Sequence, residues 1–292
     1  MKMVIKMNNL QSFQLEKKKA EKFVKMGIPM AIIGAAAFVL LGQYGFFGAL
    51  LVFPGIILIG IGTSNFSKLS RKFKTEVLID LISTYVDNGQ FIPDRGLDIG
   101  TVYSTEFVKR ADRYHTEDYL SGSMEGVNFI SSDVKLEEKH VEHTKDGTRT
   151  YYETYFLGRI FVFDFNKQFD GSLQVLEHGS PVSHTKYAKV KLESVVFNKK
   201  FKTYTTNDHS AFYVLTPHFM EALMKFEQNN KGSISFSFIK NSLYIGINNF
   251  KDTFELKMFK KLDDSLFEEF KRDLMVINEV ITELKLNRNI FK

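Results

Sequence analysis

An uncharged stretch near the N-terminus is the most pronounced pattern of polarity in the chain. No charged residue occurs from Met26 to Ser67, and two turn-prone places interrupt the apolar run, Gly42–Gly45 and Pro54-Gly55. A turn at Gly42–Gly45 gives two helices of roughly 17 to 20 residues each, long enough to cross a hydrocarbon core about 30 Å thick. A turn at Pro54-Gly55 would leave a second segment far too short to cross. The pattern therefore predicts a transmembrane helical hairpin over residues 26–66, with Pro54 inside its second helix.

A hairpin buried in a soluble core is the alternative interpretation of this stretch. Helices in soluble cores usually carry charged residues on at least one face, whereas helices that cross a membrane are largely uncharged on all faces. The small residues Gly34–Ala37 add little apolar area to the first helix, but they allow two helix backbones to approach closely. Both features favour the membrane hairpin.

The segments that flank the hairpin have patterns of a different kind. Residues 1–25 are a basic N-terminal segment, in which Asn8 to Lys25 is expected to be a short helix at the lipid headgroups or a flexible tail. Residues 67–90 are expected to contain a connecting amphipathic helix, because apolar positions recur at helical spacing from Phe73 to Tyr85. From Phe91 to Gly126 the pattern is irregular.

Strand patterns dominate the next part of the chain. Two Asp-Gly dipeptides, Asp146-Gly147 and Asp170-Gly171, each lie between strand-like segments and predict β-hairpins. A third hairpin is predicted around Asn241-Ser242, and its first strand alternates apolar residues with Ser233, Ser235 and Ser237, which predicts one buried face. The other expected strands are Val134–His143, Thr148–Leu157, Arg159–Phe165, Ser172–Leu176, Lys189–Val196 and Phe212–Leu215.

Two helices are predicted to complete this part. Thr216-Pro217 has the residue types of an N-cap followed by proline at the first helical position. Ser265 to Glu268 fits a capping box, and an apolar stripe runs from Leu266 to Leu284. The patterns predict an α+β fold, in which an N-terminal two-helix transmembrane hairpin precedes a soluble domain, residues 91–292, with an antiparallel sheet and packed helices.

Basic residues flank the uncharged stretch on both sides. Because lysine and arginine accumulate on the cytoplasmic side of spanning helices, the protein is expected in the cell membrane as a multi-pass protein, with both termini and the main domain cytoplasmic. The residues expected at the membrane surface, in contact with membrane lipids, are Lys17, Lys18, Lys19, Lys22, Lys25, Lys68, Arg71 and Lys72.

The net charge of +5 and the pI near 9.0 raise the question of nucleic-acid binding. Residues 1–67 hold the whole excess, because 39 basic and 34 acidic residues in the chain leave equal numbers after Ser67. The folded domain therefore has no general attraction for phosphate backbones, and no nucleic-acid partner is expected.

The residue types exclude several kinds of catalytic and metal site. The chain has no cysteine, so it has no disulfide, no thiolate nucleophile and no cysteine-ligated metal. His140 and His143 are three positions apart on an expected strand and so point to opposite faces, which excludes a shared metal. Gly122–Gly126 departs from the serine-hydrolase elbow, and Asp208-His209 is expected to be a turn. No metal, cofactor or catalytic residue is predicted, and an enzymatic activity is not expected, although the sequence leaves it open.

A set of short motifs resembles a known family. The motifs are Phe156-Leu157-Gly158-Arg159-Ile160-Phe161, Asp164-Phe165-Asn166-Lys167, Leu192-Glu193 with Phe197, Phe201 and Tyr204, Leu215-Thr216-Pro217 with Met220, and Leu286-Asn287. In this order, after a double-spanning anchor, they are similar to a bacterial family known as domain of unknown function 3137, over about Val127 to Phe291. Phe291 stands where the family is expected to have tryptophan. The resemblance implies a bacterial integral membrane protein and brings no known activity.

One motif is the candidate ligand-binding site. Asp164, Asn166 and Lys167 combine a carboxylate, an amide and an ammonium group, although the same residues are also typical of a strand end and a turn. The loop from Asn166 to Glu177 has the spacing of a calcium-binding EF-hand, but it has too few carboxylates and is flanked by strands instead of helices.

Three function hypotheses follow from the sequence. The first is an integral membrane protein that presents a cytosolic α+β module for binding a protein, a peptide or a lipid headgroup, helped by the high effective concentration that tethering gives. The second is a membrane-anchored enzyme without a recognisable motif. The third is a structural subunit of a membrane complex.

Overall fold

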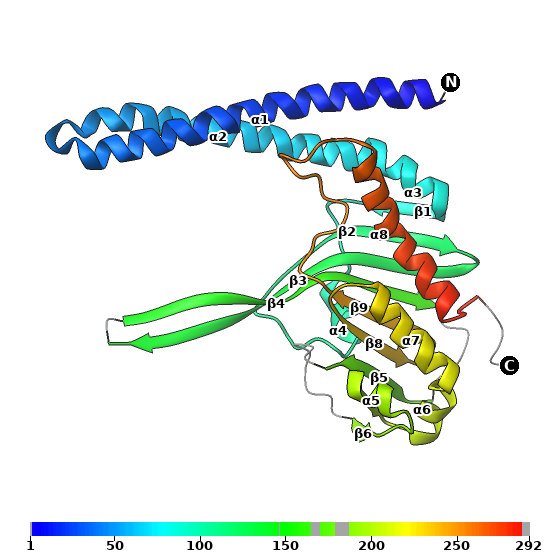
Figure 1. The fold of residues 1–292 in the computed structure, drawn as a ribbon. Coiled ribbons are helices and arrows are strands. Elements are labelled where there is room, and N and C mark those ends of the chain that lie inside the picture. Colours follow the sequence, from blue (N-terminus) through cyan, green and yellow to red (C-terminus); the bar gives the residue numbers. More distant parts are fainter. Residues whose placement is uncertain (1, 146, 165–169, 179–186, 288–292) are drawn as a thin grey trace. The chain divides into compact units, whose positions relative to one another are not determined.

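A computed structural model describes residues 2–145, 147–164, 170–178 and 187–287. The chain forms two compact units (Figure 1). The first comprises Met1–Leu78 and Glu255–Glu269, and the second comprises Ile79–Phe254 and Phe270–Lys292. Two apolar helices precede an antiparallel sheet with packed helices, which confirms the predicted α+β class.

The first unit begins with the predicted hairpin. Helix α1 (Lys2–Leu40) and helix α2 (Phe46–Phe73) are joined by the short 3-10 turn η1 (Gly42–Tyr44), which confirms the turn. Both helices extend beyond the uncharged stretch, and Gly27 and Pro29 near its start lie inside α1 without ending it. The expected short helix over residues 8–25 is therefore part of α1, and α2 continues into one π-helical turn, η2 (Lys74–Leu78).

Small residues form the contact between α1 and α2. A Cβ atom placed on Gly27 would lie 2.6 Å from the carbonyl oxygen of Gly55, and one placed on Gly34 would lie 2.7 Å from that of Gly48. Gly62 continues the row, since a Cβ there would lie 2.8 Å from the carbonyl oxygen of Ala20. We call this row the glycine seam. Only glycine allows the two backbones to pack this closely.

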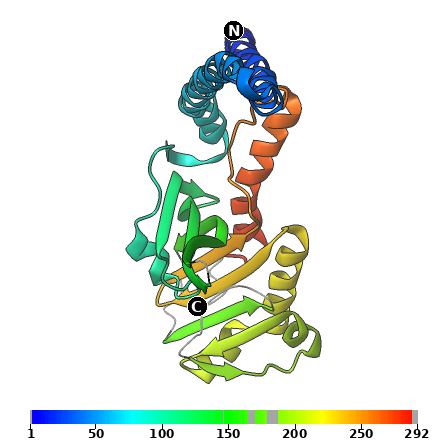
Figure 2. The same ribbon diagram turned by 90° about the vertical axis from the view of Figure 1, so that its left-hand side faces the viewer.

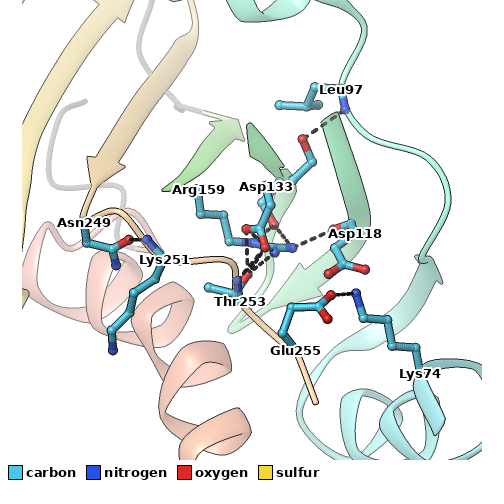
Figure 3. Close-up of polar contacts among 11 residues, drawn as sticks. Lys74, Leu97, Asp118, Asp133, Arg159, Asn249, Lys251, Thr253 and Glu255 are labelled. Atoms are coloured by element: carbon cyan, nitrogen blue, oxygen red, sulfur yellow. Dashed lines mark hydrogen bonds and ion pairs between the residues drawn. The ribbon is translucent and has the colours of Figure 1, made fainter. Parts of the chain in front are cut away.

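The segment Glu255–Glu269 packs against the charged base of the same hairpin. The Gln14 amide nitrogen Nε2 donates to the backbone oxygen of Leu262 at 2.7 Å. The Phe73 ring lies 6.1 Å from Phe267, and Lys74 forms an ion pair with Glu255 (Figure 3). No local pattern predicts this contact, because nearly 200 residues of chain lie between the two parts.

The second unit contains a nine-stranded antiparallel sheet within the described residues. The strand order is β1-β2-β3-β4-β9-β8-β5-β7-β6. The strands are β1 (Asp87–Ile92), β2 (Arg113–Met124), β3 (Val127–Thr144), β4 (Gly147–Asp164), β5 (Ser172–Glu177), β6 (Ala188–Val190), β7 (Phe201–Thr205), β8 (Ser233–Ile239) and β9 (Ser242–Asn248). The helices are α3 (Ile79–Tyr85), α4 (Ile99–Ser104), α5 (Val195–Lys200), α6 (Asp208–Val214), α7 (Pro217–Asn229) and α8 (Asp264–Glu283), whose first turns belong to the first unit.

Both faces of the central strands are covered. Figure 2 shows α7 and the later part of α8 on one side of the sheet and α4 on the other. Helix α7 packs through Phe226, whose ring lies 5.9 Å from that of Phe236. On the opposite side Phe107 lies over Gly246. The prediction that β8 has one buried face is wrong, since Ser235 and Ser237 are 2 % and 0 % exposed under this second layer.

Two of the three predicted hairpins are confirmed. Strands β3 and β4 pair from Thr144 opposite Gly147 onward, and β8 and β9 pair around Asn241-Ser242. The hairpin predicted around Asp170-Gly171 is wrong, because β5 pairs with β7 and β8 while β4 pairs with β9. An Asp-Gly dipeptide favours a reversal of the chain but does not determine which strand becomes the partner.

Other local predictions also need correction. The segment predicted as a strand at Phe212–Leu215 belongs mainly to α6, since Ala211, Val214 and Leu215 are buried at helical spacing. The irregular region from Phe91 to Gly126 contains α4 and the whole of β2. The strand predicted over 189–196 is divided between the short β6 and the first turn of α5. Thr216 is confirmed as the N-cap of α7, because its hydroxyl accepts from the Phe219 N–H at 3.3 Å.

The helix predicted from Ser265 begins one residue earlier. The Asp263 carboxylate accepts from the Ser265 N–H at 3.1 Å, so it caps the first turn of α8. Asp263 takes the capping role that the sequence suggested for Ser265, because aspartate binds the same free N–H groups and is favoured by the helix dipole.

Strands β3 and β4 extend beyond the sheet as a two-stranded arm (Figure 1). The arm runs from the pair Glu137 and Thr154 to the pair Thr144 and Gly147. Most of its side chains are exposed, and the His140 ring stacks on Tyr151 at 5.2 Å. An isolated ribbon of two strands is marginally stable in water, so the arm depends on cross-strand pairs of this kind.

Candidate functional site

A cleft of about 730 Å³ lies in the second unit, between the sheet and helices α7 and α8. Its size is in the range that holds small ligands or a short segment of chain. Its floor contains Arg159, Phe161 and Ile247. Its walls come from the end of α7, from α8 and from the segment after β9. The polar wall residues used below are Lys225, Asn229, Asn230, Lys231, Asn249, Lys251, Thr253, Arg272, Asp273, Glu279 and Glu283.

Arg159 at the floor is fully engaged by hydrogen bonds (Figure 3). Its Nη1 donates to Asp133 Oδ1 at 2.9 Å and to Thr253 Oγ1 at 2.7 Å. Its Nη2 donates to the Asp118 backbone oxygen at 2.9 Å, and both Nη2 and Nε donate to Ser131 Oγ at 3.2 Å. A guanidinium group has five N–H donors, and these contacts use all of them.

The ion pair of Arg159 and Asp133 is deeply buried, with side chains 4 % and 3 % exposed. Burial raises the pKa of Asp133 to about 6, while Arg159 and the hydrogen bonds from Thr253 oppose this shift. Asp133 is therefore ionised at neutral pH. It also accepts from the Thr253 N–H at 2.7 Å, which fixes the segment after β9 to strand β3. We call these residues, with Ser131 and Asp118, the Arg159 network, and its geometry gives it the role of shaping the cleft floor.

The acidic groups on the cleft walls are also engaged. Lys225 forms an ion pair with Glu283 at 2.6 Å. The Asn229 and Asn230 amides donate to the two carboxylate oxygens of Glu279, at 2.6 Å and 3.1 Å. These contacts join α7 to α8 along one side of the cleft.

Three cations on the cleft rim have no ion pair within the described part of the chain. They are Lys231, Lys251 and Arg272, and all three are exposed. Glu283 is paired with Lys225, whereas the amides that bind Glu279 carry no charge, so Glu279 and Asp273 oppose the three rim cations and leave a small positive excess. The cleft therefore suits a ligand with an acidic group and an apolar part that reaches Phe161 and Ile247.

The titratable groups that line the cleft are lysines, arginines and the carboxylates of Asp273, Glu279 and Glu283. No histidine is among the described residues that line it. The described parts of the chain also contain no group of three or more His, Cys, Asp or Glu residues placed to hold a metal ion. Amides, hydroxyls and ammonium groups that line a partly apolar cleft are typical of a binding site.

The structure places the predicted ligand-binding residues only in part. Asp164 ends β4, is exposed and accepts from Asn128 Nδ2 at 3.0 Å. Asn166 and Lys167 lie outside the described residues. Glu177, the last position of the EF-hand-like spacing, accepts from the Ile234 N–H at 2.9 Å and pairs with Lys200 at 3.2 Å, so its carboxylate has a structural role.

The predicted membrane-surface residues differ in exposure. Lys18, Lys19, Lys22, Lys25, Lys68, Arg71 and Lys72 are exposed along the bases of α1 and α2. Lys17 is buried, and its ammonium group pairs with Glu21 and donates to the backbone oxygen of Met258. It is therefore held within the protein, whereas the other residues of the set face outward.

Sequence reasoning missed the Arg159 network. Arg159 was assigned to a strand as one residue of a motif, without a role for its charge. Its partner residues come from distant strands, since Thr253 is 94 positions from Arg159 and 120 from Asp133. The signal present in the sequence is a single charged residue within an apolar strand segment. Burying such a charge costs free energy unless a counter-charge lies beside it.

The comparisons with known proteins bear on this region. Residues 154–286 match the family described as "Protein of unknown function (DUF3137)". We call residues 154–286 the DUF3137 segment. The match confirms the resemblance carried by the short motifs, and the DUF3137 segment contains all the residues named above as lining the cleft. Asp133, Ser131 and Asp118 of the Arg159 network precede it.

No curated protein matches the chain. Among solved structures, the chain is similar to the crystal structure of the mycobacterial trehalose monomycolate transport factor A, TtfA, with 8% sequence identity and a TM-score of 0.40. The similarity covers 73% of this chain and 94% of that chain. A similarity at this level carries no argument about what the DUF3137 segment does.

Proposed function

We propose that the protein is a bilayer-anchored binding module. In this proposal the α1–α2 hairpin crosses the membrane, the sheet unit lies in the cytoplasm, and the cleft of the DUF3137 segment binds a partner. One observation carries the proposal, namely the distribution of large and small residues over the hairpin.

The hairpin has small residues inside and large apolar residues outside. The glycine seam lies between the helices, whereas Leu40 is 81% exposed and Phe53 is 68% exposed. The same holds for most large residues of the stretch, including Ile32, Ile33, Phe38, Val39, Phe46, Phe47, Leu50, Ile56 and Ile57. A hairpin from a soluble core would bury these side chains. Apolar surface of this extent is stable in contact with lipid and unstable in water.

The lengths of the two helices also support crossing. The segments Leu10–Leu40 and Phe46–Tyr85 are both long and apolar enough to span a membrane, and 17% of the apolar window of each is buried. Basic residues lie at both open ends of the hairpin, whereas the turn at Gly42–Tyr44 has no charge. This asymmetry supports a cytoplasmic location for both ends.

The cleft supports the binding part of the proposal. Its rim carries the cations Lys231, Lys251 and Arg272, and its walls carry amides that suit hydrogen bonds to a peptide or a similar polar chain. We infer that the partner presents an acidic segment with an apolar residue. Proximity to the membrane would raise the effective concentration of a membrane-bound partner.

The experiment that tests the anchor uses the absence of cysteine from the chain. Single-cysteine variants Tyr44→Cys, in the hairpin turn, and Glu125→Cys, in the exposed turn between β2 and β3, are expressed in cells and treated with a membrane-impermeant maleimide. We expect Tyr44→Cys to react in intact cells and Glu125→Cys to react only after permeabilisation.

Two outcomes contradict the proposal. Labelling of Glu125→Cys in intact cells would place the sheet unit outside. Release of the wild-type protein from membranes by alkaline carbonate would show that the hairpin does not cross the bilayer.

A further inference from the structure

A second, smaller cavity lies in the first unit between α1 and α2. Its volume is about 280 Å³. The side chains around it are those of Glu16, Lys19, Asn65, Lys68 and Lys72, and the buried residues Ala20 and Leu69 form its floor. We call it the basal groove.

The basal groove is cationic. Three ammonium groups face one carboxylate, and Lys72 is 3.9 Å from Glu16 and 5.3 Å from the centre of the Phe13 ring. Lys19 and Lys68 have no ion pair within the described residues, and both are exposed. Two positive charges are therefore available on opposite helices, one from α1 and one from α2.

The depth of the basal groove follows from the helix contacts. Gly62, the last residue of the glycine seam, packs against Ala20, which is part of the groove floor. At 1.5 Å per residue, Asn65 lies about 4.5 Å beyond Gly62 and Lys68 about 9 Å beyond it. The headgroup layer occupies roughly 5 to 8 Å on each side of the hydrocarbon core. In the proposed insertion Gly62 lies about 27 Å along the helix from Tyr44 and so near the surface of the hydrocarbon core, which puts the long side chains of Lys19 and Lys68 within reach of the lipid phosphates.

We propose that the basal groove binds the phosphate of an anionic phospholipid. Lys19 and Lys68 would contact the phosphate from both helices, and the Asn65 amide would donate to its ester oxygens. A lipid is favoured over free phosphate because the groove opens at the edge of the uncharged stretch, where acyl chains lie against α1 and α2. This inference rests on the proposed insertion of the hairpin in the membrane.

The test measures lipid binding by the full-length protein in neutral detergent micelles, which present no charged surface of their own. Native mass spectrometry gives the affinity for added phosphatidylglycerol and, for comparison, phosphatidylcholine. The variant Lys19→Gln/Lys68→Gln is compared with Lys18→Gln/Lys22→Gln, which removes the same charge from exposed positions outside the groove.

We expect the groove variant to bind phosphatidylglycerol roughly 30-fold more weakly, about fivefold for each lysine. The control variant and phosphatidylcholine binding should change less than about twofold. Lys19→Arg/Lys68→Arg should retain most of the affinity, since arginine keeps both the charge and the donors for a phosphate.

Several results would overturn the inference. Equal losses in the groove and control variants would mean that the lipid responds to overall charge. Displacement of the lipid by millimolar inorganic phosphate would identify a site for the free ion. Carbonate extraction of the same wild-type protein distinguishes failure of the membrane anchor from failure of the lipid site. If the protein stays in membranes but shows no preference for phosphatidylglycerol, only lipid binding by the basal groove is contradicted.

Discussion

Replacing Arg159 by methionine tests the Arg159 network most directly. The change removes the five donated hydrogen bonds and leaves the Asp133 carboxylate with donors from Thr253 only, in a site where its side chain is 3% exposed. Removing one partner of a buried ion pair costs about 3 to 5 kcal/mol. For a unit of this size each kcal/mol lowers Tm by roughly 2 to 4 °C, so we expect a decrease of about 6 to 20 °C.

The pH dependence of this loss is more specific than its size. The pKa of Asp133 in the folded protein, about 6, is already above the unfolded value near 3.8. A group with a raised pKa contributes stability that is complete below the unfolded pKa and is lost as pH rises through the folded pKa. Because Arg159 lowers this pKa, Arg159→Met raises it further. The variant should therefore continue to lose stability above pH 6, by about 1.4 kcal/mol per pH unit until its new pKa is passed.

The measurement is thermal unfolding of the purified full-length protein in detergent, followed by near-UV circular dichroism at several pH values between 5 and 8. Lys135→Met is the matched control, since Lys135 is on the neighbouring strand β3, two positions from Asp133, and its ion pair with Glu137 at 2.8 Å is partly exposed. It should cost less than about 1 kcal/mol at every pH. Adding Asp133→Asn to Arg159→Met should restore stability at pH 8, because no uncompensated carboxylate remains. A deficit that is the same at all pH values would refute the assignment of a coupled ion pair.

Three further changes have expected outcomes. Gly55→Val should lower the resistance of the hairpin to unfolding in sodium dodecyl sulfate, because its Cβ would lie 2.7 Å from the Ala31 nitrogen, whereas Gly60→Val, with open space around it, should have little effect. Thr216→Ala should cost about 1 kcal/mol in chemical unfolding through loss of the α7 N-cap, and Thr216→Ser should restore most of it. Asp164→Ala should change Tm by only a few degrees through loss of the Asn128 contact, and loss of a cellular activity in the stably folded variant would instead identify a functional carboxylate.

The parts of the fold that the sequence predicted depend on local patterns. The turn at Gly42–Tyr44, the cap at Thr216 and the β8–β9 hairpin each follow from residues a few positions apart. The pairing of β4 with β9 and the burial of Ser237 depend on strands and layers that are distant in the sequence. Periodicity shows that a residue type fits a face, but it does not identify what covers the other face.

The candidate site was less predictable for the same reason. Arg159, Asp133 and Thr253 meet only after three strands and a following loop are in place. Asp164, the described residue of the candidate motif, ends β4, whereas the cleft is lined by Arg159 and Phe161, a few positions earlier on the same strand. A lone charge within an apolar strand segment is the sequence signal of this site, because the cost of burying it requires a partner somewhere in the fold.

The contact between Glu255–Glu269 and the hairpin base has a consequence for biosynthesis. The hairpin is translated first and can enter the membrane while the rest of the chain is still on the ribosome. About 180 further residues must be translated before the contacts of the hairpin base can form, which takes roughly 10 to 40 seconds at ordinary rates of translation. Only then can Gln14, Phe73 and Lys74 contact Leu262, Phe267 and Glu255, respectively. A chain truncated before Glu255 would keep the hairpin but leave this surface uncovered, and an uncovered surface of this kind is what chaperones and proteases recognise in incomplete proteins.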